Sequence, residues 1–468
     1  MIRATKTNRR VVVTGIGIIC SLGVSLKEFW ENCLSNNTKV ENIPKKWHDY
    51  ATFTSTIWSP LPEIAFGNYG ISNIESMKLD VSAQLAMATT YMALENAGIE
   101  KEMTNLKNKT YSLKAIDPAR TGVIYGTGIG GSVSMLASHA YQALANHKND
   151  LAKIVKNSEG QGNESFKEQL TNINNKMLIP NRFNPFVASM SMPNACSSNI
   201  SIKYGITGPS NTLCSACASG TVAIGHAYRA IKHNIVDIAV TGATEYLHDD
   251  YGSHFRGFDI LGALAQDKGD KDKANRPFDK KRCGFLFSEG ASATLILEDL
   301  EHAINRGAEI LGEIIGFSES CDANNIMIIE KNSPHIKRMI INALDEAGLN
   351  PGDIDYINTH GTGTLVNDEI EANIINDLFG KKPLVNATKS LLGHTIGASG
   401  AIEAVVSLLS MKNNKTHICN NLEEPILDLN FVTKVKESEI NTAISPSYGF
   451  GGHNSVLVMK DFHTSSML

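Results

Sequence analysis

One succession of elements occurs twice in this chain, and this repeat constrains the fold more than any other feature. A turn of small residues is followed by an expected helix and then by an apolar strand, over residues 215–242 and again over 359–387. The first turn contains Cys217 and the second contains His360. From each residue to the start of the following strand is a similar distance, 21 residues in the first copy and 24 in the second. Two halves of like topology would place both residues at the carboxyl ends of strands, where open α/β sheets bind ligands.

The rest of the chain also alternates strands and helices, as an α/β fold requires. Apolar runs bounded by glycines or polar residues predict strands at residues 10–20, 121–126, 237–242, 355–358, 384–387, 442–447 and 456–459. Longer segments predict helices at 26–34, 81–97, 221–233 and 368–378. A polar segment at 146–176, rich in Lys, Asn, Gln and Glu, predicts a surface insertion of two helices joined by a turn.

Composition excludes several classes of protein. The chain has 468 residues, of which 42% are hydrophobic and 19% charged, as in soluble globular proteins. A net charge of -5 gives no reason to expect nucleic acid as a partner, and no apolar run is long enough to predict a membrane span. The eight cysteines are scattered along the chain, which fits a cytoplasmic protein. Cys214 and Cys217 have the spacing of a redox pair or half a metal site, but no second pair or His cluster completes a metal set.

Cys217 stands just before an expected helix, in the segment Ser-Ala-Cys-Ala-Ser-Gly. Unpaired N–H groups and the positive end of the helix dipole favour a thiolate at such a position, and the thiolate is the nucleophile. The alternative is a buried structural cysteine.

Two histidines follow strands in glycine-containing turns. His360 lies in the first such turn, and His394 lies in the turn at residues 388–397, after the next strand. A cysteine with paired histidines is a set for covalent catalysis, in which the thiolate attacks and the imidazoles polarise a carbonyl or move a proton. Chance placement of two histidines in equivalent turns is the competing explanation.

Two glycine-rich turns are less specific. The turn at residues 448–454 connects two expected strands and could also present a backbone donor to an oxyanion. Residues 126–131 match G-x-G-x-x-G after a strand. A dinucleotide site is disfavoured there, because no strand ending in Asp or Glu follows about 20 residues later.

Together these segments resemble the elongating 3-oxoacyl-acyl-carrier-protein synthases, the β-ketoacyl synthases of the thiolase superfamily. The resemblance covers nearly the whole chain. Its motifs, in chain order, are residues 10–17, 126–131, 208–210, 216–220, 276–279, 284–285, 289–291, 360–364, Lys389, 393–394 and 449–452.

The resemblance implies a thiolase-like, five-layered αβαβα fold made of two pseudo-symmetric halves. Residues 1–305 would form the half with the nucleophilic cysteine, including the polar insertion at about 140–180, and residues 306–468 would form the half with both histidines. It also implies an enzyme that condenses a malonyl thioester, with loss of CO2, onto an acyl chain held on Cys217. The partner would be an acyl carrier protein, the assembly a homodimer, and no cofactor or metal would be needed, because phosphopantetheine arrives on the carrier as tethered substrate.

Catalytic roles follow from the same resemblance. Cys217 would accept the acyl group, and His360 and His394 would bind the malonyl thioester and promote decarboxylation. Lys389 would support the two histidines electrostatically, with Glu403 as its ionic partner.

Further roles concern the substrate. The backbone N–H groups of the nucleophile and of Phe450 would form the oxyanion hole, and the Phe450 ring would act as a gate. Thr362 and Thr364 would hydrogen-bond the phosphopantetheine arm. Ile129 and Phe258 would line the acyl pocket.

Two other functions remain as alternatives. A degradative, coenzyme A-dependent thiolase would be expected to use a second cysteine near the C-terminus, but none follows Cys419. A non-catalytic, chain-length-factor-like subunit would lack the nucleophile that Cys217 provides. Since carrier proteins of this family are acidic, a basic docking surface is expected, with the candidates Lys280, Lys281, Arg282, Arg256 and Arg229.

Overall fold

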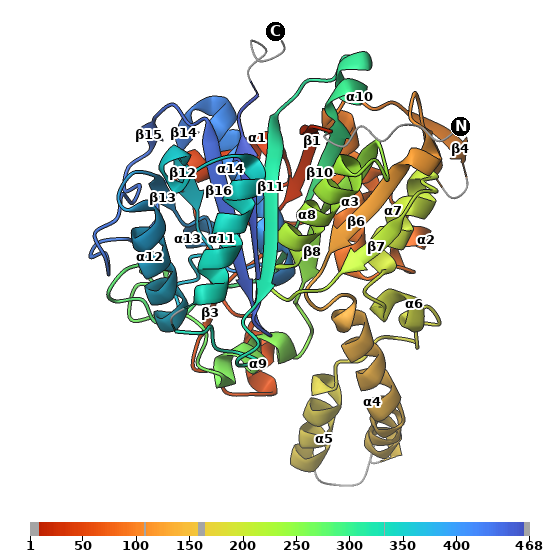
Figure 1. The fold of residues 1–468 in the computed structure, drawn as a ribbon. Coiled ribbons are helices and arrows are strands. Elements are labelled where there is room, and N and C mark those ends of the chain that lie inside the picture. Colours follow the sequence, from red (N-terminus) through yellow and green to blue (C-terminus); the bar gives the residue numbers. More distant parts are fainter. Residues whose placement is uncertain (1–8, 107–108, 158–163, 332, 463–468) are drawn as a thin grey trace.

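The computed structural model describes residues 9–106, 109–157, 164–331 and 333–462 (Figure 1). Within these ranges, ten strands form one sheet in the order β13-β12-β16-β17-β11-β1-β10-β8-β6-β7. In chain order the strands are β1 (Val11–Ile19), β6 (Thr121–Gly126), β7 (Ser210–Leu213), β8 (Ile238–Tyr246), β10 (Gly290–Asp299), β11 (Gly312–Cys321), β12 (Tyr356–Asn358), β13 (Leu384–Asn386), β16 (Thr442–Gly449) and β17 (His453–Lys460).

The sheet consists of two halves with the same strand order. Numbered along the chain within this sheet, its first five strands lie in the order third, second, fourth, fifth, first from the edge inward, and its last five repeat this order. In each half the second strand is parallel to its two neighbours, whereas the remaining pairs are antiparallel. β1 and β11 join the halves, with Val11 opposite Ile314 and Val13 opposite Gly312. The duplication itself is confirmed, but the predicted match between the turns of Cys217 and His360 is wrong, because Cys217 follows β7, the third strand of its half, whereas His360 follows β12, the second strand of the other half. The division at residues 305 and 306 stays a prediction.

Helices complete the five predicted layers. The outer layers hold α3 (Val81–Asn96) and α7 (Ala195–Tyr204) on the first half, and α11 (Pro334–Ala347) and α12 (Leu365–Phe379) on the second. The central layer is formed by α8 (Ser219–Lys232) and α14 (Ser399–Asn413).

The central helices pack closely because small residues face each other. A Cβ on Gly220 would lie 2.5 Å from the backbone nitrogen of Ala401, so a larger residue there would force α8 and α14 apart. α14 is buried from Ser399 to Met411, which explains why apolar and small residues occupy every side of it. β1 is likewise buried along its whole length, as expected for a strand covered on both faces.

Shorter elements surround this core. They are α1 (Leu26–Leu34), β2 (Glu41–Asn42), β3 (Ile57–Ser59), α2 (Asn73–Ser76), β4 (Lys101–Asn105), β5 (Thr110–Leu113), α6 (Val187–Ser191), α9 (Ser253–Ile260), β9 (Phe287–Ser288), α10 (Leu300–Asn305), α13 (Lys389–Leu392), β14 (Lys415–Thr416) and β15 (Lys436–Glu437). Among the described residues, none of the helices combines the length and apolar character that crossing a bilayer requires.

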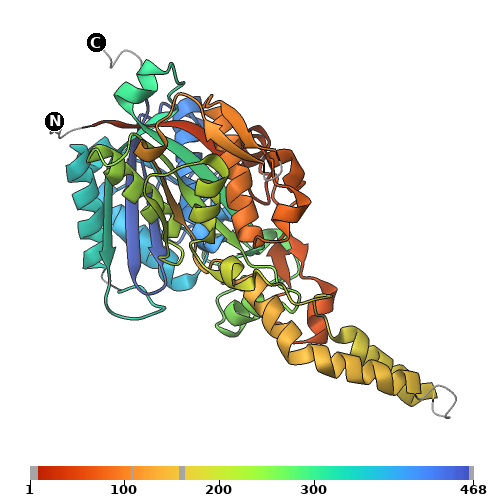
Figure 2. The ribbon, with the colours of Figure 1, turned by 90° about the vertical axis from the view of Figure 1, so that its right-hand side faces the viewer.

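The predicted insertion is a helical hairpin that projects from the body of the molecule (Figure 2). It consists of α4 (Ser132–Asn157) and α5 (Glu164–Lys176), and the residues that connect them lie outside the described part of the chain. At its base, Nζ of Lys148 donates to the carbonyl of Met177 at 2.8 Å. The hydroxyls of Tyr50 and Tyr251 donate to backbone carbonyls at the end of α5 and just beyond it. The prediction of two helices is confirmed.

Candidate active site

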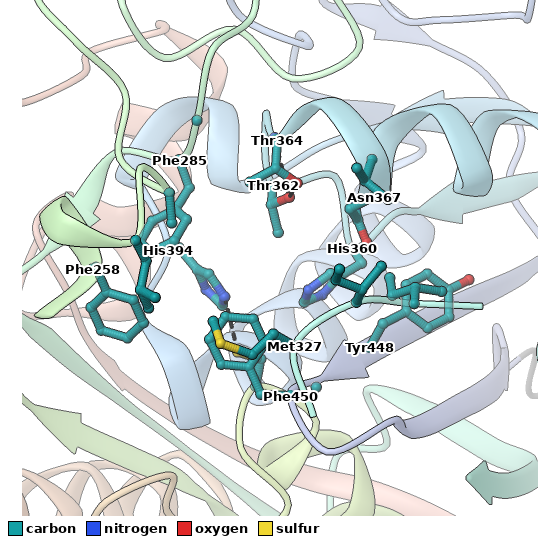
Figure 3. A pocket seen from close by; sticks show the side chains of 18 of the residues that line it. Phe258, Phe285, Met327, His360, Thr362, Thr364, Asn367, His394, Tyr448 and Phe450 are labelled. Carbon is teal, nitrogen blue, oxygen red and sulfur yellow. Dashed lines mark hydrogen bonds between the residues drawn. The ribbon is translucent and has the colours of Figure 1, made fainter. Parts of the chain in front are cut away.

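Cys217, His360 and His394 lie together in one cavity of about 360 Å³. Cys217 lies between β7 and α8, His394 occupies the matching position of the second half between β13 and α14, and His360 follows β12. Nε2 of His394 lies 3.1 Å from Sγ of Cys217. The two imidazole rings are nearly perpendicular, with centroids 5.5 Å apart. Figure 3 shows both rings directed into the cavity.

The turn at Cys217 places its sulfur against backbone donors. Ala216 has a φ of 49°, and the N–H groups of Cys217 and Phe450 lie within hydrogen-bonding reach of Sγ. The Phe450 loop can approach because residue 449 is glycine. A Cβ on Gly449 would lie 2.6 Å from the carbonyl oxygen of Ser215 and 3.2 Å from the nitrogen of Cys217.

Burial, however, keeps the Cys217 sulfur protonated. It raises the pKa of the thiol to about 12, although the charge of Lys389 and the N–H of Phe450 lower it. Burial therefore outweighs the predicted effect of the helix start, and the thiol form prevails at neutral pH. The cost of removing an anion from water is the physical reason.

The surroundings of His394 determine which ring nitrogen carries its proton. The backbone N–H of Ile396 donates to Nδ1 at 3.2 Å, and the hydroxyl of Ser399 lies 2.9 Å from the same atom. Since Nδ1 accepts, the proton is on Nε2, which faces Cys217. Burial, assisted by the charge of Lys389, lowers the pKa of His394 well below its usual range, so the imidazole is neutral.

His360 is arranged in the same way by a different donor. Nζ of Lys389 lies 3.3 Å from Nδ1 of His360 and donates to the backbone carbonyl of the same residue at 2.7 Å. An ammonium can only donate, so Nδ1 accepts and the proton is on Nε2. Burial and the nearby Lys389 and His394 lower the pKa of His360 well below its usual range. Lys389 also forms a buried ion pair with Glu403.

Two carboxylates that sequence reasoning missed hold the His360 turn in place. Glu371 accepts from the N–H groups of His360 at 2.7 Å and Gly361 at 2.8 Å. Asp368 accepts from the N–H of Gly363 at 3.1 Å. Burial raises the pKa of Glu371 to about 8. The available signal was Asp368 in the first turn of α12 and Glu371 three positions later, on the same face of the helix.

Glu245 is a third missed carboxylate, and it links two turns. It accepts from the N–H groups of Gly128 at 2.7 Å, Ile129 at 3.2 Å and Gly397 at 3.1 Å. The N–H groups at residues 126–131 that could hold a pyrophosphate thus already bind an internal carboxylate, which disfavours the dinucleotide interpretation further. The signal in the sequence was a single acidic residue in the otherwise uncharged strand β8.

The structure also places the residues that were assigned to substrate. Thr362 and Thr364 line the cavity, with their hydroxyl oxygens 2.9 Å apart. Phe258 and Phe450 line it as well, and their ring centroids are 6.5 Å apart. Ile129 is not among the lining residues of this cavity, and its side chain is 38% exposed.

Two of the five predicted docking residues are misplaced for that role. Arg282 is buried and donates to the carbonyls of Thr364 at 3.2 Å and Leu365 at 2.7 Å, so the prediction that it belongs to a docking surface is wrong. Arg229 lies in the last turn of α8, at the opposite end from Cys217, and pairs with Glu319 at 3.1 Å.

Comparisons with known proteins agree with this arrangement. The family "Beta-ketoacyl synthase, N-terminal domain" matches residues 8–303, and the corresponding C-terminal domain matches residues 311–423. The 3-oxoacyl-[acyl-carrier-protein] synthase 2 of Coxiella burnetii is 34% identical over 459 residues, which cover 97% of this chain and 98% of that protein.

Solved ketosynthases share the fold. A β-ketoacyl synthase from Burkholderia phymatum has a TM-score of 0.80 and 27% identity, covering 97% of this chain and all of that one. A type II polyketide ketosynthase, solved with its acyl-carrier protein and bound to the hexaketide, has a TM-score of 0.77 and 26% identity, again covering 97% of this chain and 100% of its own. The chain described here belongs to the β-ketoacyl synthase family and has that family's thiolase-like fold.

Proposed function

We propose that this protein is a β-ketoacyl-acyl-carrier-protein synthase that lengthens acyl chains by decarboxylative Claisen condensation, in fatty-acid elongation or a related polyketide-type pathway. The observation that carries the proposal is the position of His394, whose Nε2 lies 3.1 Å from Sγ of Cys217, with His360 in the same cavity. Both neutral imidazoles carry a proton on Nε2, so the site combines one nucleophile with two hydrogen-bond donors.

In the first step, Cys217 accepts the acyl group from a carrier thioester. The sulfur attacks the carbonyl, the bond between carbonyl carbon and carrier sulfur breaks, and the proton of the thiol passes to the departing carrier thiol. The N–H groups of Cys217 and Phe450 would bind the oxyanion of the tetrahedral intermediate. Their position beside Sγ supports this role.

In the second step, a malonyl thioester enters and loses CO2. The electron pair of the broken bond becomes an enolate, whose oxygen requires hydrogen-bond donors. The Nε2–H groups of His360 and His394 would supply them in a site that excludes water. Because the loss of CO2 drives the condensation, the proposed reaction needs neither a metal nor a redox cofactor.

In the third step, the enolate carbon attacks the acyl-Cys217 carbonyl. A carbon–carbon bond forms, the bond to the Cys217 sulfur breaks, and the released thiolate takes up a proton from solvent. Lys389, paired with Glu403, would keep His360 neutral and oriented throughout. Thr362 and Thr364 would bind the pantetheine arm, and the rings of Phe258 and Phe450 would border the acyl chain.

We also propose a cytoplasmic homodimer that works with an acyl carrier protein. β7 ends the described sheet, and Ile202 on the adjacent helix α7 is 68% exposed. An unpaired strand edge beside an exposed isoleucine fits a subunit interface. That Ile129 lines the acyl pocket is part of the same proposal, since Ile129 is not among the residues that line the cavity of a single chain. The mass of the protein in solution tests the dimer.

The alternatives fit the site less well. A coenzyme A-dependent thiolase would be expected to use a second cysteine near the C-terminus, and no cysteine follows Cys419. A chain-length-factor-like subunit would have no use for Cys217 and His394 in hydrogen-bonding contact.

The test is condensation of acyl- and malonyl-carrier substrates of graded chain length, with products identified by mass spectrometry. We expect ketoacyl products and release of CO2 from the wild-type protein. Cys217→Ala should abolish condensation, and His360→Ala should still become acylated but fail to decarboxylate the malonyl thioester. A folded protein that is neither acylated nor alkylated at Cys217 would favour the partner-subunit alternative.

A further inference from the structure

The mouth of the active-site cavity is built from exposed apolar side chains. Apart from Gly262, the described residues that both line the cavity and are exposed to solvent are large and apolar, with exposed fractions from 37% to 57%: Leu261, Met327, Ile328, Leu365, Val366 and Phe450. Ile260 and Ile326 continue this surface, with side chains 74% and 76% exposed. An exposed apolar cluster of this kind marks an interaction site in soluble proteins. We call these eight residues the apolar rim.

Hydrogen bonds hold the apolar rim in its exposed conformation. The N–H of Gly451 donates to the carbonyl of Ile326 at 2.6 Å, which ties the loop after β11 to the loop that carries Phe450. The side chain of Asn325 accepts from the N–H groups of Met327 at 2.8 Å and Ile328 at 3.1 Å. On the other side of the mouth, the buried Arg282 holds the carbonyl of Leu365. The aliphatic side chains are therefore presented to solvent by ordered backbone.

Two of the basic residues expected at this surface, Lys280 and Lys281, already have carboxylate neighbours within the chain. Lys281 lies 3.4 Å from Glu424 and 3.7 Å from Glu423, and Lys280 lies 3.9 Å from Glu424. An acidic partner would have to compete with these internal carboxylates. Arg256 stays exposed on α9, one helical turn before Ile260, and adds a positive charge beside the rim.

We propose that the apolar rim is the docking surface for the carrier protein, so that the carrier binds mainly by burying aliphatic side chains and only weakly through charge. This inference rests on the proposed function. Cys217 is 6% exposed and both histidines are 3% exposed, so a thioester reaches them only on an arm that passes through the mouth while its protein stays outside. A carrier protein in that position covers the rim, and burial of apolar surface stabilises the complex without dependence on salt.

The experiment compares carrier-bound substrates with the same acyl groups on free pantetheine. The ratio of kcat/KM for the two substrate forms isolates carrier docking, since both forms use the same catalytic groups. The double variant Ile260→Ser/Ile326→Ser changes the two most exposed rim residues. Ile235→Ser is the matched control, because Ile235 is 56% exposed and lies beyond the far end of α8. Lys280→Glu/Lys281→Glu tests the role of charge.

We expect the ratio to fall about tenfold in the double isoleucine variant and to change less than about twofold in the other two variants. We also expect KM for the carrier substrate to change less than about threefold between about 50 and 500 mM NaCl. A large loss in the lysine variant, with steep salt dependence and an unaffected isoleucine variant, would overturn the proposal in favour of charge-directed docking.

Two other results bear on the inference. Binding of phosphatidylcholine–phosphatidylglycerol vesicles that the double isoleucine variant abolishes, with an unchanged substrate ratio, would assign the rim to a lipid surface and overturn carrier docking. Absence of condensation from free pantetheine thioesters as well as from carrier substrates would count against the proposed function itself.

Discussion

The ammonium of Lys389 lies 3.3 Å from Nδ1 of His360, and this contact determines that the proton of the imidazole is on Nε2. The same ammonium is paired with Glu403, and both side chains are almost completely buried. One cation thus has two separable effects: it orients His360 for catalysis, and it compensates a carboxylate that would otherwise be buried alone.

Replacement of Lys389 separates these effects. We expect Lys389→Met to lower the free energy of unfolding by about 3–5 kcal/mol, because it leaves Glu403 buried without a partner. Lys389→Met/Glu403→Leu should recover most of that stability, as an apolar pair can replace a buried ion pair. Condensation should stay impaired in both, because Nδ1 of His360 has lost its donor. Urea denaturation and the condensation assay measure the two quantities, and wild-type condensation by the double variant would show that Lys389 acts through folding alone.

Gly449 allows the Phe450 loop to contact the nucleophile turn. In Gly449→Ala, the new Cβ would lie 2.6 Å from the Ser215 carbonyl oxygen, so the loop or the turn has to move. We expect condensation to fall about 100-fold, the size of effect seen when one oxyanion donor is displaced. Stability should fall by about 1–3 kcal/mol, as in other overpacked sites. Gly352→Ala is the control, since a Cβ there has open space. Equal activities of the two variants would argue against a positioned Phe450 N–H.

The reactivity of Cys217 should depend steeply on pH. With a pKa raised to about 12 by burial, the thiol form prevails at neutral pH, and the thiolate fraction rises tenfold with each unit of pH below that value. Since the pKa of His394 is lowered well below its usual range, this imidazole stays neutral over the pH range of the experiment and does not change the rate by titrating. Alkylation of Cys217 by iodoacetamide should therefore accelerate about tenfold per pH unit from about pH 6 to 9.

Peptide mass spectrometry is the measurement required, because Cys283 lines the same cavity and Cys214 is exposed. A plateau of the Cys217 rate below about pH 9 would mean that the start of α8 lowers the thiol pKa more than burial raises it.

The projecting hairpin should be dispensable for the chemistry. No described residue of α4 or α5 lines the active-site cavity. Replacing residues 150–173 by a short Gly-Ser turn would shorten α4, remove α5 except for residues 174–176, and retain Lys148 and Met177, whose hydrogen bond lies at the base of the hairpin. We expect condensation rates to stay within about twofold, since the reacting groups and their supports are untouched.

Sedimentation of the shortened protein tests whether the hairpin belongs to a subunit interface. A wild-type mass would reject that role. A fall to the mass of one chain would assign the hairpin to the subunit interface.

Local sequence was enough to predict the elements that carry the site. Turns of small residues and apolar runs depend on short-range backbone preferences, so strands such as β6 and helices such as α1 begin and end where expected. Arg282 shows the limit of this reasoning, since its charge suggested a surface position that its burial contradicts.

The sequence by itself determined the α/β duplication and the residue types at its strand-to-helix turns, because both are written in local periodicity and turn chemistry. Only the tertiary structure decided that Cys217 is a protonated thiol, that Lys389 orients His360, and that Glu245 and Glu371 hold the turns in place. Those properties arise from burial and from contacts between distant segments, and the free energy of a charge depends on how much water the packed chain leaves around it.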